Sequence, residues 1–160
     1  MTSLEHAAGS TLNEVGSLAD DLVGTWRLLS RIDRDASGGP VDELTLGSDP
    51  VALLFFDRAG NFAAQFMKRD RSVADAAPLF TGQNNTAAIG GYDAYFGTYE
   101  VDETSGDVHT RLVGALSPDH VGATMNRNMN VEDGRLVIRL TTTTADERAV
   151  HRTLTWERAG

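Results

Sequence analysis

The sequence predicts an all-β fold, an eight-stranded antiparallel up-and-down β-barrel with a short N-terminal helical turn. Short stretches rich in Val, Thr, Phe, Tyr and Leu alternate with clusters of Gly, Pro, Asp and Ser, as strands alternate with turns. No segment keeps a helical period over three turns. An even number of consecutive antiparallel strands can close without leaving an exposed edge. A β-sandwich is the alternative, and it would need Greek-key crossings that such short turns do not favour.

The elements can be assigned in order along the chain. Residues 1–16 are rich in small and polar types without a sustained period, so we expect a flexible arm before a barrel domain over 17–160. Ser17 is suited to cap one helical turn that reaches Val23. Asp133-Gly134 is the strongest hairpin signal. The expected strands cover residues 24–33, 51–57, 61–67, 92–102, 107–116, 120–131, 135–144 and 148–158.

Successive connections of such a barrel alternate between its two ends. The connections expected at one end, two of them long, are 34–50, 68–91, 117–119 and 145–147. The tight turns expected at the other end are 57–60, 103–106 and 132–134. Long loops inside a compact domain usually serve function or are disordered. The sequence therefore predicts one closed end and one binding mouth.

Composition excludes several classes of function. The 160 residues include 14 Lys and Arg against 23 Asp and Glu, a net charge of −9, so we expect no nucleic-acid or membrane partner. Cysteine is absent, which excludes disulfides, thiolate metal sites and cysteine nucleophiles. Neither a secretory signal nor an apolar run of about 20 residues is visible, so we expect a cytoplasmic protein. The four histidines are scattered and no cofactor motif occurs, so we expect no metal and no cofactor.

Two motifs carry a family resemblance. Gly24-Thr25-Trp26 resembles the Gly-X-Trp signature that opens the first strand of lipocalins, whose relatives place a basic side chain across the Trp, as Arg158 could do here. The stretch Tyr95-Phe96-Gly97-Thr98-Tyr99-Glu100-Val101-Asp102, followed by residues 117–122 and Arg127, is similar to the bacterial and fungal lipocalin-like domain family over about residues 22–158. The family pattern has a histidine pair where this chain has His109-Thr110-Arg111.

The resemblance implies a calycin-type barrel that holds a small, mostly apolar molecule. Barrels of this kind also occur as isomerases and cyclases in natural-product biosynthesis.

Period-2 alternation predicts which side chains face the interior. If Trp26 points inward, Leu28, Ser30 and Ile32 follow it, while Arg27, Arg31 and Asp33 point outward. Other residues expected inside are Phe62, Ala64, Phe66, Tyr95, Gly97, Tyr99, Val101, Met125, Met129, Val131, Leu136, Ile138, Leu140, Val150, Leu154 and Trp156. His109 and Arg111 are expected to face solvent.

Two arginines, Arg127 and Arg152, fall on these apolar faces. A buried guanidinium costs several kcal/mol unless it is paired. The phenols of Tyr95 and Tyr99, or a ligand with an anionic or carbonyl group, are candidate partners. We therefore predict Arg127 and Tyr95 as catalytic residues. The predicted ligand-binding residues are Phe66, Tyr99, Met125, Met129, Arg152 and Trp156.

Structural alternatives remain open for these residues. Arg127 could bond to backbone carbonyls and a structural carboxylate near the closed end. The two tyrosines could be ordinary core aromatics with satisfied hydroxyls. Met125 and Met129 could fill gaps without touching a ligand.

The sequence-based hypothesis is a barrel that encloses one small organic molecule and promotes a cofactor-free isomerisation or cyclisation. A fixed cation and a phenol can polarise a carbonyl or stabilise an enolate, and Arg152 would anchor a carboxylate or enolate. A carrier without catalysis is the first alternative, and a barrel with a solid interior is the second. The oligomeric state stays open, with a homodimer as one option.

Overall fold

The computed structural model describes residues 16–75 and 88–160, so most of the arm expected over 1–16 lies outside the described residues. The described residues include a short α-helix, α2 (Leu18–Leu22), and a 3-10 turn, η2 (Pro118–His120). The strands are β1 (Gly24–Arg34), β2 (Pro40–Val41), β3 (Val51–Phe56), β4 (Asn61–Met67), β5 (Tyr92–Val101), β6 (Asp107–Ala115), β7 (Thr124–Glu132), β8 (Arg135–Thr143) and β9 (Ala149–Arg158).

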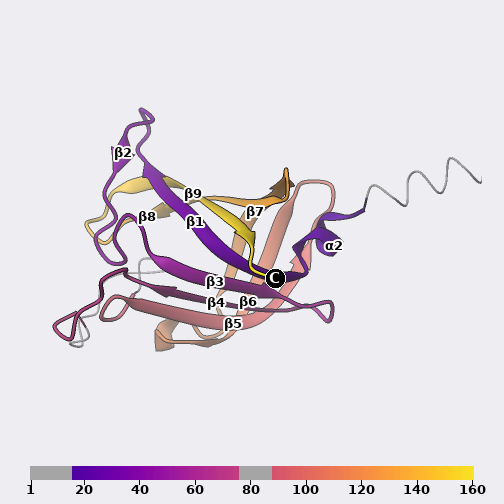
Figure 1. Ribbon diagram of the computed structural model, residues 1–160, viewed down its shortest axis with the longest axis horizontal. Helices are drawn as coiled ribbons and strands as arrows, with labels where there is room; N and C mark the ends of the chain where they lie inside the picture. Colours follow the sequence, from indigo (N-terminus) through magenta and orange to yellow (C-terminus); the bar gives the residue numbers. More distant parts are fainter. Residues whose placement is uncertain (1–15, 76–87) are drawn as a thin grey trace, which may run out of the picture.

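The strands form one closed antiparallel barrel. From β3 to β9 each strand pairs with the next along the chain, and β1 pairs with both β3 and β9. Eight strands thus form the wall, because β2 only extends one end of β1. In Figure 1 the sheet curls around so that β1 and β9 lie side by side. The predicted up-and-down barrel is confirmed.

Two boundaries differ from the sequence prediction. The sixth wall strand begins at Thr124 instead of residue 120, because η2 occupies part of the expected strand. The two-residue strand β2 was not predicted and lies inside the expected long loop. The hairpin at Asp133 and Gly134 is confirmed, with positive φ angles of 52° and 76° as a type I′ turn requires. The Ser17 hydroxyl caps α2 by accepting from the Asp20 amide.

The connections separate into two ends as predicted. Figure 1 shows the tight turns between β3 and β4 and between β5 and β6 at the same end as α2. The segment from β1 to β3 and the described parts of the connection from β4 to β5, residues 68–75 and 88–91, lie at the opposite end, here called the mouth. No helix in the described part of the chain is long and apolar enough to cross a membrane.

Trp26 anchors the closed end. Its ring is fully buried and its Nε1 donates to the Leu22 carbonyl at 2.9 Å, which fixes α2 across the barrel floor. The Arg158 guanidinium lies 4.3 Å from the centre of the Trp26 ring and donates to the carbonyls of Val23 and Asp21. Gly24 has φ +136°, and a Cβ there would lie 2.8 Å from Arg158 Nη1. Glycine at this position lets the arginine cover the tryptophan.

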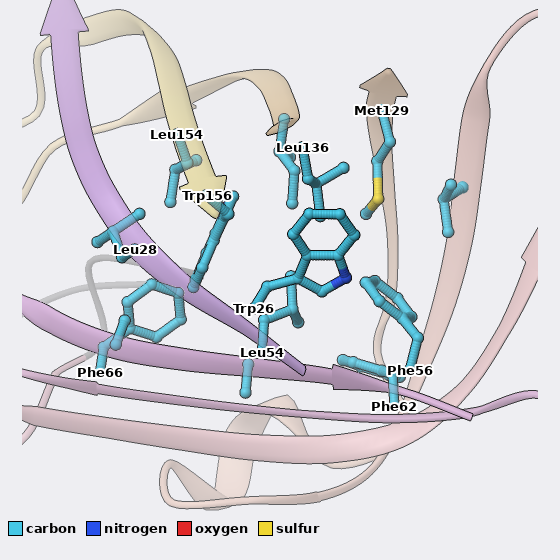
Figure 2. Packing of buried hydrophobic residues seen from close by; sticks show 14 of the residues in the cluster. Trp26, Leu28, Leu54, Phe56, Phe62, Phe66, Met129, Leu136, Leu154 and Trp156 are labelled. Atoms are coloured by element: carbon cyan, nitrogen blue, oxygen red, sulfur yellow. The ribbon is translucent and has the colours of Figure 1, made fainter. Parts of the chain in front are cut away.

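Buried side chains from β1, β3, β4, β6, β7, β8 and β9 fill the barrel interior, and partly buried side chains of β5 pack against them. Figure 2 shows part of this cluster around Trp26 and Trp156. Phe66 and Trp156 meet edge to face with ring centres 5.9 Å apart. Phe56 packs near Phe62 and meets Tyr99 edge to face at 4.9 Å. The apolar residues predicted to face inward on β4, β7 and β8, and Leu154 and Trp156 on β9, are in this buried cluster or packed against it, and Val150 is buried outside it. Aromatic and aliphatic packing thus provides the main apolar core.

The prediction for the mouth half of β1 was wrong. Leu28 pairs with Trp156 whereas Ser30 pairs with Thr155, so Leu29 is the extra residue of a β-bulge. The extra residue reverses the alternation of every side chain that follows it. Ile32, expected inside, is therefore exposed, as Ser30 partly is. Arg31 and Asp33, expected outside, are 5% and 4% exposed and face the interior.

A second bulge shapes the outer face of the barrel. Phe96 pairs with Gly114 but Gly97 pairs with Leu112, which leaves Val113 as the extra residue of β6. The Phe96 ring covers Gly114 closely enough that a Cβ there would lie 2.4 Å from it. At Gly97 a Cβ would lie only 1.8 Å from the Arg111 carbonyl oxygen. Backbone atoms cannot move aside as a flexible side chain can, so only glycine fits at position 97.

We expect Gly97→Ala to lower the free energy of unfolding by about 3 kcal/mol or more, because the methyl group would force β5 away from β6. Urea unfolding followed by tryptophan fluorescence measures this loss. Gly39→Ala is the matched control, since its Cβ would meet only the Asp35 side chain at 3.4 Å. A loss at Gly97 as small as that at Gly39 would contradict this account of the bulge.

Candidate functional site

The barrel encloses a cavity of about 40 Å³ on its axis. Aliphatic and aromatic side chains from β3, β4, β7, β8 and β9 form most of its wall, including Phe66 and Trp156. Its polar lining groups are Tyr95, Thr110 and Arg127. A larger, solvent-open groove of about 810 Å³ lies on the outer face along Phe55, Phe96 and Val113. The interior cavity is the candidate site because it combines enclosure with converging polar groups.

The cavity has room for at most about three water molecules, since each needs roughly 10–15 Å³. Pockets for organic ligands usually measure about 300–1,000 Å³. Met125, Met129 and Arg127 all line the space, and their long side chains have several rotatable bonds. An organic ligand therefore requires these side chains to change rotamer. The predicted hollow is present, but it is much smaller than a typical ligand pocket in this conformation.

Above this cavity, toward the mouth, the interior contains buried ion pairs. Arg152 on β9 donates from Nε and Nη2 to both carboxylate oxygens of Asp33, at 2.7 and 2.8 Å. Neither side chain is more than 1% exposed. The bulge in β1 creates this contact, because it places Asp33 directly opposite Arg152 on the inner face. Most of the charge of Arg152 is thus balanced within the protein.

Arg31 forms the second ion pair, which links the segment between β2 and β3 to the barrel wall. Its Nη1 donates to Glu43 Oε2 at 2.9 Å, and both side chains are almost fully buried. Glu43 also accepts from the backbone amides of Thr45 and Leu46. Burial opposes ionisation of Glu43, but the Arg31 guanidinium and these hydrogen bonds outweigh it and lower the pKa of Glu43. Burial and the nearby Arg152 lower the pKa of Arg31.

Arg127 on β7 differs from these two arginines. Its side chain lines the cavity, and its guanidinium contacts the Asn126 carbonyl at 3.1 Å and Met125 Sδ at 3.3 Å. Within residues 16–75 and 88–160 no carboxylate lies within ion-pair distance of it. Burial lowers the pKa of Arg127, and the like charge of Arg152 acts in the same direction. Of the alternatives considered from sequence, the backbone contact is present, whereas no structural carboxylate pairs with Arg127 among these residues.

Tyr95 lies on the inner face of β5 beside the cavity. Its ring packs near Phe62 and Phe66, with centres 6.0 and 6.3 Å apart. Burial raises the pKa of the Tyr95 phenol, and the neighbouring Asp93 carboxylate raises it further. The hydroxyl therefore stays protonated at neutral pH. Tyr95 is suited to donate a hydrogen bond and unsuited to act as a base.

Asp93 is an interior residue that sequence reasoning missed. It lies two positions before Tyr95 on the same face of β5 and is 2% exposed. Burial raises the pKa of Asp93 to about 6, although the Ala94 amide and the Arg31 charge oppose this shift. Its Oδ2 has no hydrogen-bond partner in the described part of the chain. Extending the alternation of Tyr95, Gly97 and Tyr99 by one more step toward the mouth would have found it.

The structure brings most of the predicted site residues together. Phe66, Tyr95, Met125, Arg127, Met129 and Trp156 line the cavity. Arg152 does not line the cavity; it lies nearer the mouth, in its ion pair with Asp33. Tyr99 lies nearer the closed end, where its hydroxyl donates to the Asp57 carbonyl at 2.6 Å, as expected for a core aromatic. His109 and Arg111 are exposed, as predicted.

We expect Asp33→Asn to lower the free energy of unfolding by about 3–5 kcal/mol, since it leaves the Arg152 charge buried without an anionic partner. Thermal and urea unfolding measure the loss. The control is Glu157→Gln, which breaks the partly exposed pair with Arg27 and should cost less than about 1 kcal/mol. Equal losses for the two variants would contradict a stabilising contribution from the buried pair.

We expect Asp93→Asn to become more stable relative to the unchanged protein as pH rises from 4 to 7. Because the pKa of Asp93 is raised to about 6, the native state binds the extra proton, and stability is lost as pH rises toward that value. A pKa raised by roughly two units lowers the stability of the unchanged protein by about 3 kcal/mol between pH 4 and pH 7, and the variant avoids this loss. Urea unfolding at several pH values checks this, with the exposed Asp119→Asn as control. A difference that is independent of pH would show that Asp93 has an ordinary pKa.

Comparison with known proteins agrees with the architecture. A family model described as a lipocalin-like domain matches residues 23–159. A search of curated proteins found no significant match. The match covers the whole barrel, from the Trp26 floor to the last strand, and confirms the resemblance inferred from Gly24-Thr25-Trp26 and residues 95–102. The chain therefore belongs to the lipocalin-like domain family.

Proposed function

We propose that the barrel binds one small, largely apolar organic molecule in its interior and promotes a cofactor-free isomerisation or cyclisation of it. Eight-stranded barrels can enclose a small ligand, and the family match supports binding. The observation that carries the catalytic part is Arg127. This guanidinium lines an otherwise mainly apolar cavity and has no carboxylate at ion-pair distance among the described residues. A ligand oxygen is a suitable partner for it.

The chemistry follows from the two donors at the cavity wall. A carbonyl oxygen of the ligand would accept hydrogen bonds from Arg127 and from the protonated phenol of Tyr95. A water molecule, for which the cavity has room, would accept a proton from the neighbouring carbon; the electron pair of that C–H bond moves into the carbon–carbon bond, and charge develops on the carbonyl oxygen. Each well-placed donor is worth about 2.7–4 kcal/mol at this stage. Return of the proton to another carbon gives an isomer, without any redox cofactor.

The walls would contribute by shaping the ligand. Phe66, Trp156 and Met125 surround the space from different strands, so a flexible chain bound there loses most of its conformers. Holding reacting atoms near each other lowers the entropic part of the barrier. A carrier is the alternative function, and it is favoured by the fact that Arg152 is already paired with Asp33. The two functions share a binding site and differ only in turnover.

We expect the protein to accelerate exchange of the α-protons of 2-tetralone, an apolar ketone, with deuterated solvent. Because Arg127 stabilises the enolate oxygen, Arg127→Met should slow this exchange about 100-fold or more while the protein stays folded. Proton NMR of the ketone follows the exchange, and its effect on the melting temperature reports binding. Arg111→Met, an exposed arginine on the outer face, is the control and should leave the rate unchanged.

Each outcome selects one function. Binding of 2-tetralone with no accelerated exchange would assign the protein as a carrier. Exchange that survives Arg127→Met would remove Arg127 from catalysis. Failure of both 2-tetralone and the neutral fluorophore N-phenyl-1-naphthylamine to bind would disprove interior binding.

A further inference from the structure

One side of the barrel presents apolar side chains to solvent. Strands β3 and β4 contain no charged residue, and β3 directs Val51, Leu53 and Phe55 outward, each 36–40% exposed. On the strands that follow, Phe96 of β5 is 54% exposed and Val113 of β6 is 55% exposed. These five side chains are here called the outer apolar face. Contiguous exposed apolar surface of several hundred Å² marks an interaction site.

Charge separates this face from the opposite wall. The outward residues of β8 and β9 include Arg135, Arg139 and Glu157. Figure 1 shows β3, β4 and β5 along one side of the barrel and β8 and β9 along the other. Among the described residues, the charged ones that line the outer groove are Asp57 and Arg58, and their charges cancel. Because the chain has a net charge of −9, two copies repel each other least at this neutral face.

The strand register forms the groove between two aromatic ridges. Phe55 pairs opposite Ala63, and Ala63 pairs opposite Phe96, so the two rings flank a small residue on the outer face. Their strands lie two strand spacings, or about 10 Å, apart. A third aromatic ring fits between them at the usual centre distances of about 4.5–7 Å. The groove of about 810 Å³ thus lies beside rings of the size that fills it.

The Phe96 ridge is fixed by its own packing. Its ring covers Gly114 so closely that a Cβ there would lie 2.4 Å from the ring. The bulge residue Val113 lines the groove beside it. A side chain that is already ordered loses little conformational entropy when a partner covers it.

Polar side chains on the same face already have partners. Gln65 Oε1 accepts a hydrogen bond from the Tyr92 hydroxyl at 2.8 Å. Asn61 Nδ2 donates to Asp57 Oδ2 at 3.0 Å. Burying polar groups is costly when they have no hydrogen-bond partner. These contacts within the chain therefore lower the cost of covering the face.

We propose that a second copy of this chain covers the outer apolar face, in a two-fold symmetric dimer whose axis passes near Ala63. The same patch then faces itself, and a ring of each copy enters the groove of the other. An interface of standard size buries about 800 Å² per partner, a little over half of it apolar. With roughly 150–200 Å² for a side chain of this size, the outer apolar face exposes about 400 Å². It therefore supplies most of the apolar area that a stable dimer needs.

Sedimentation velocity from about 1 to 100 µM tests the dimer, since interfaces of this size have micromolar or tighter dissociation constants. Phe55→Glu places two like charges across the axis and should raise the dissociation constant about 100-fold or more. The control is Ile32→Glu, on the outer face of β1 beside β9, where the replaced side chain is 40% exposed. It should leave the dissociation constant unchanged, and circular dichroism checks that both variants fold.

A distance measurement identifies the face that forms the contact. Because the chain has no cysteine, Thr98→Cys and Arg139→Cys each carry one spin label per copy. Thr98 lines the outer groove, whereas Arg139 lies on the opposite wall. Double electron–electron resonance should give a shorter distance between copies for the label at position 98 than for the label at position 139.

Three results would overturn the proposal. The first is a monomer at every concentration. The second is a dimer with the unchanged dissociation constant in folded Phe55→Glu, and the third is a shorter distance for the label at position 139. A monomer that binds N-phenyl-1-naphthylamine and loses this binding in Phe55→Glu would assign the groove to a small apolar ligand. If Phe55→Glu does not fold, the label distances in the otherwise unchanged protein decide.

Discussion

The pairing of β1 with β9 is the constraint on which the rest of this molecule depends. It closes the barrel, and without it both strands would be open edges. The pairing is irregular because Leu29 is an extra residue, and this bulge turns the mouth half of β1 around its axis. Asp33 thereby meets Arg152 inside the barrel. One inserted residue thus brings Asp33, the partner of Arg152, to the inner face of the barrel.

The interior is divided into two layers with different physical functions. Near the closed end, Trp26 and the aromatic side chains around it exclude water and supply most of the burial that stabilises the fold. Near the mouth, the charged side chains of Arg31, Asp33 and Arg152 occupy buried inward positions, where the closed end has apolar side chains. A layer of ion pairs rarely stabilises a core better than well-packed apolar residues would. The ion pairs near the mouth therefore contribute less to stability than the apolar packing near the closed end.

The mouth segment belongs to the same electrostatic system. Glu43 holds Arg31 with one oxygen atom and uses both oxygens to accept backbone amides of its own loop. The position of this loop is therefore coupled to the charged layer below it. Arg127 and Asp93, by contrast, are interior charged groups that form no ion pair within the described part of the chain.

The sequence by itself determined the wall of the barrel and its apolar lining. Strand periodicity and turn residues are local signals, so the eight wall strands, the Asp133-Gly134 hairpin and the inward positions of Phe66, Met129 and Trp156 were predictable. The family motifs at Gly24-Thr25-Trp26 identified the closed end for the same reason. Arg127 was predictable as an inward charge because its strand is regular.

Only the tertiary structure decided the charged layer and the free volume. A bulge has no dependable local signal, since it depends on how two distant strands must pair to close the barrel, so Asp33 and Arg31 were placed on the wrong face. The pairing of Arg152 with Asp33 joins residues 119 positions apart. The cavity of about 40 Å³ depends on which rotamers the packed side chains adopt together. Alternation fixes the direction of a side chain, whereas partners and space are set by the whole fold.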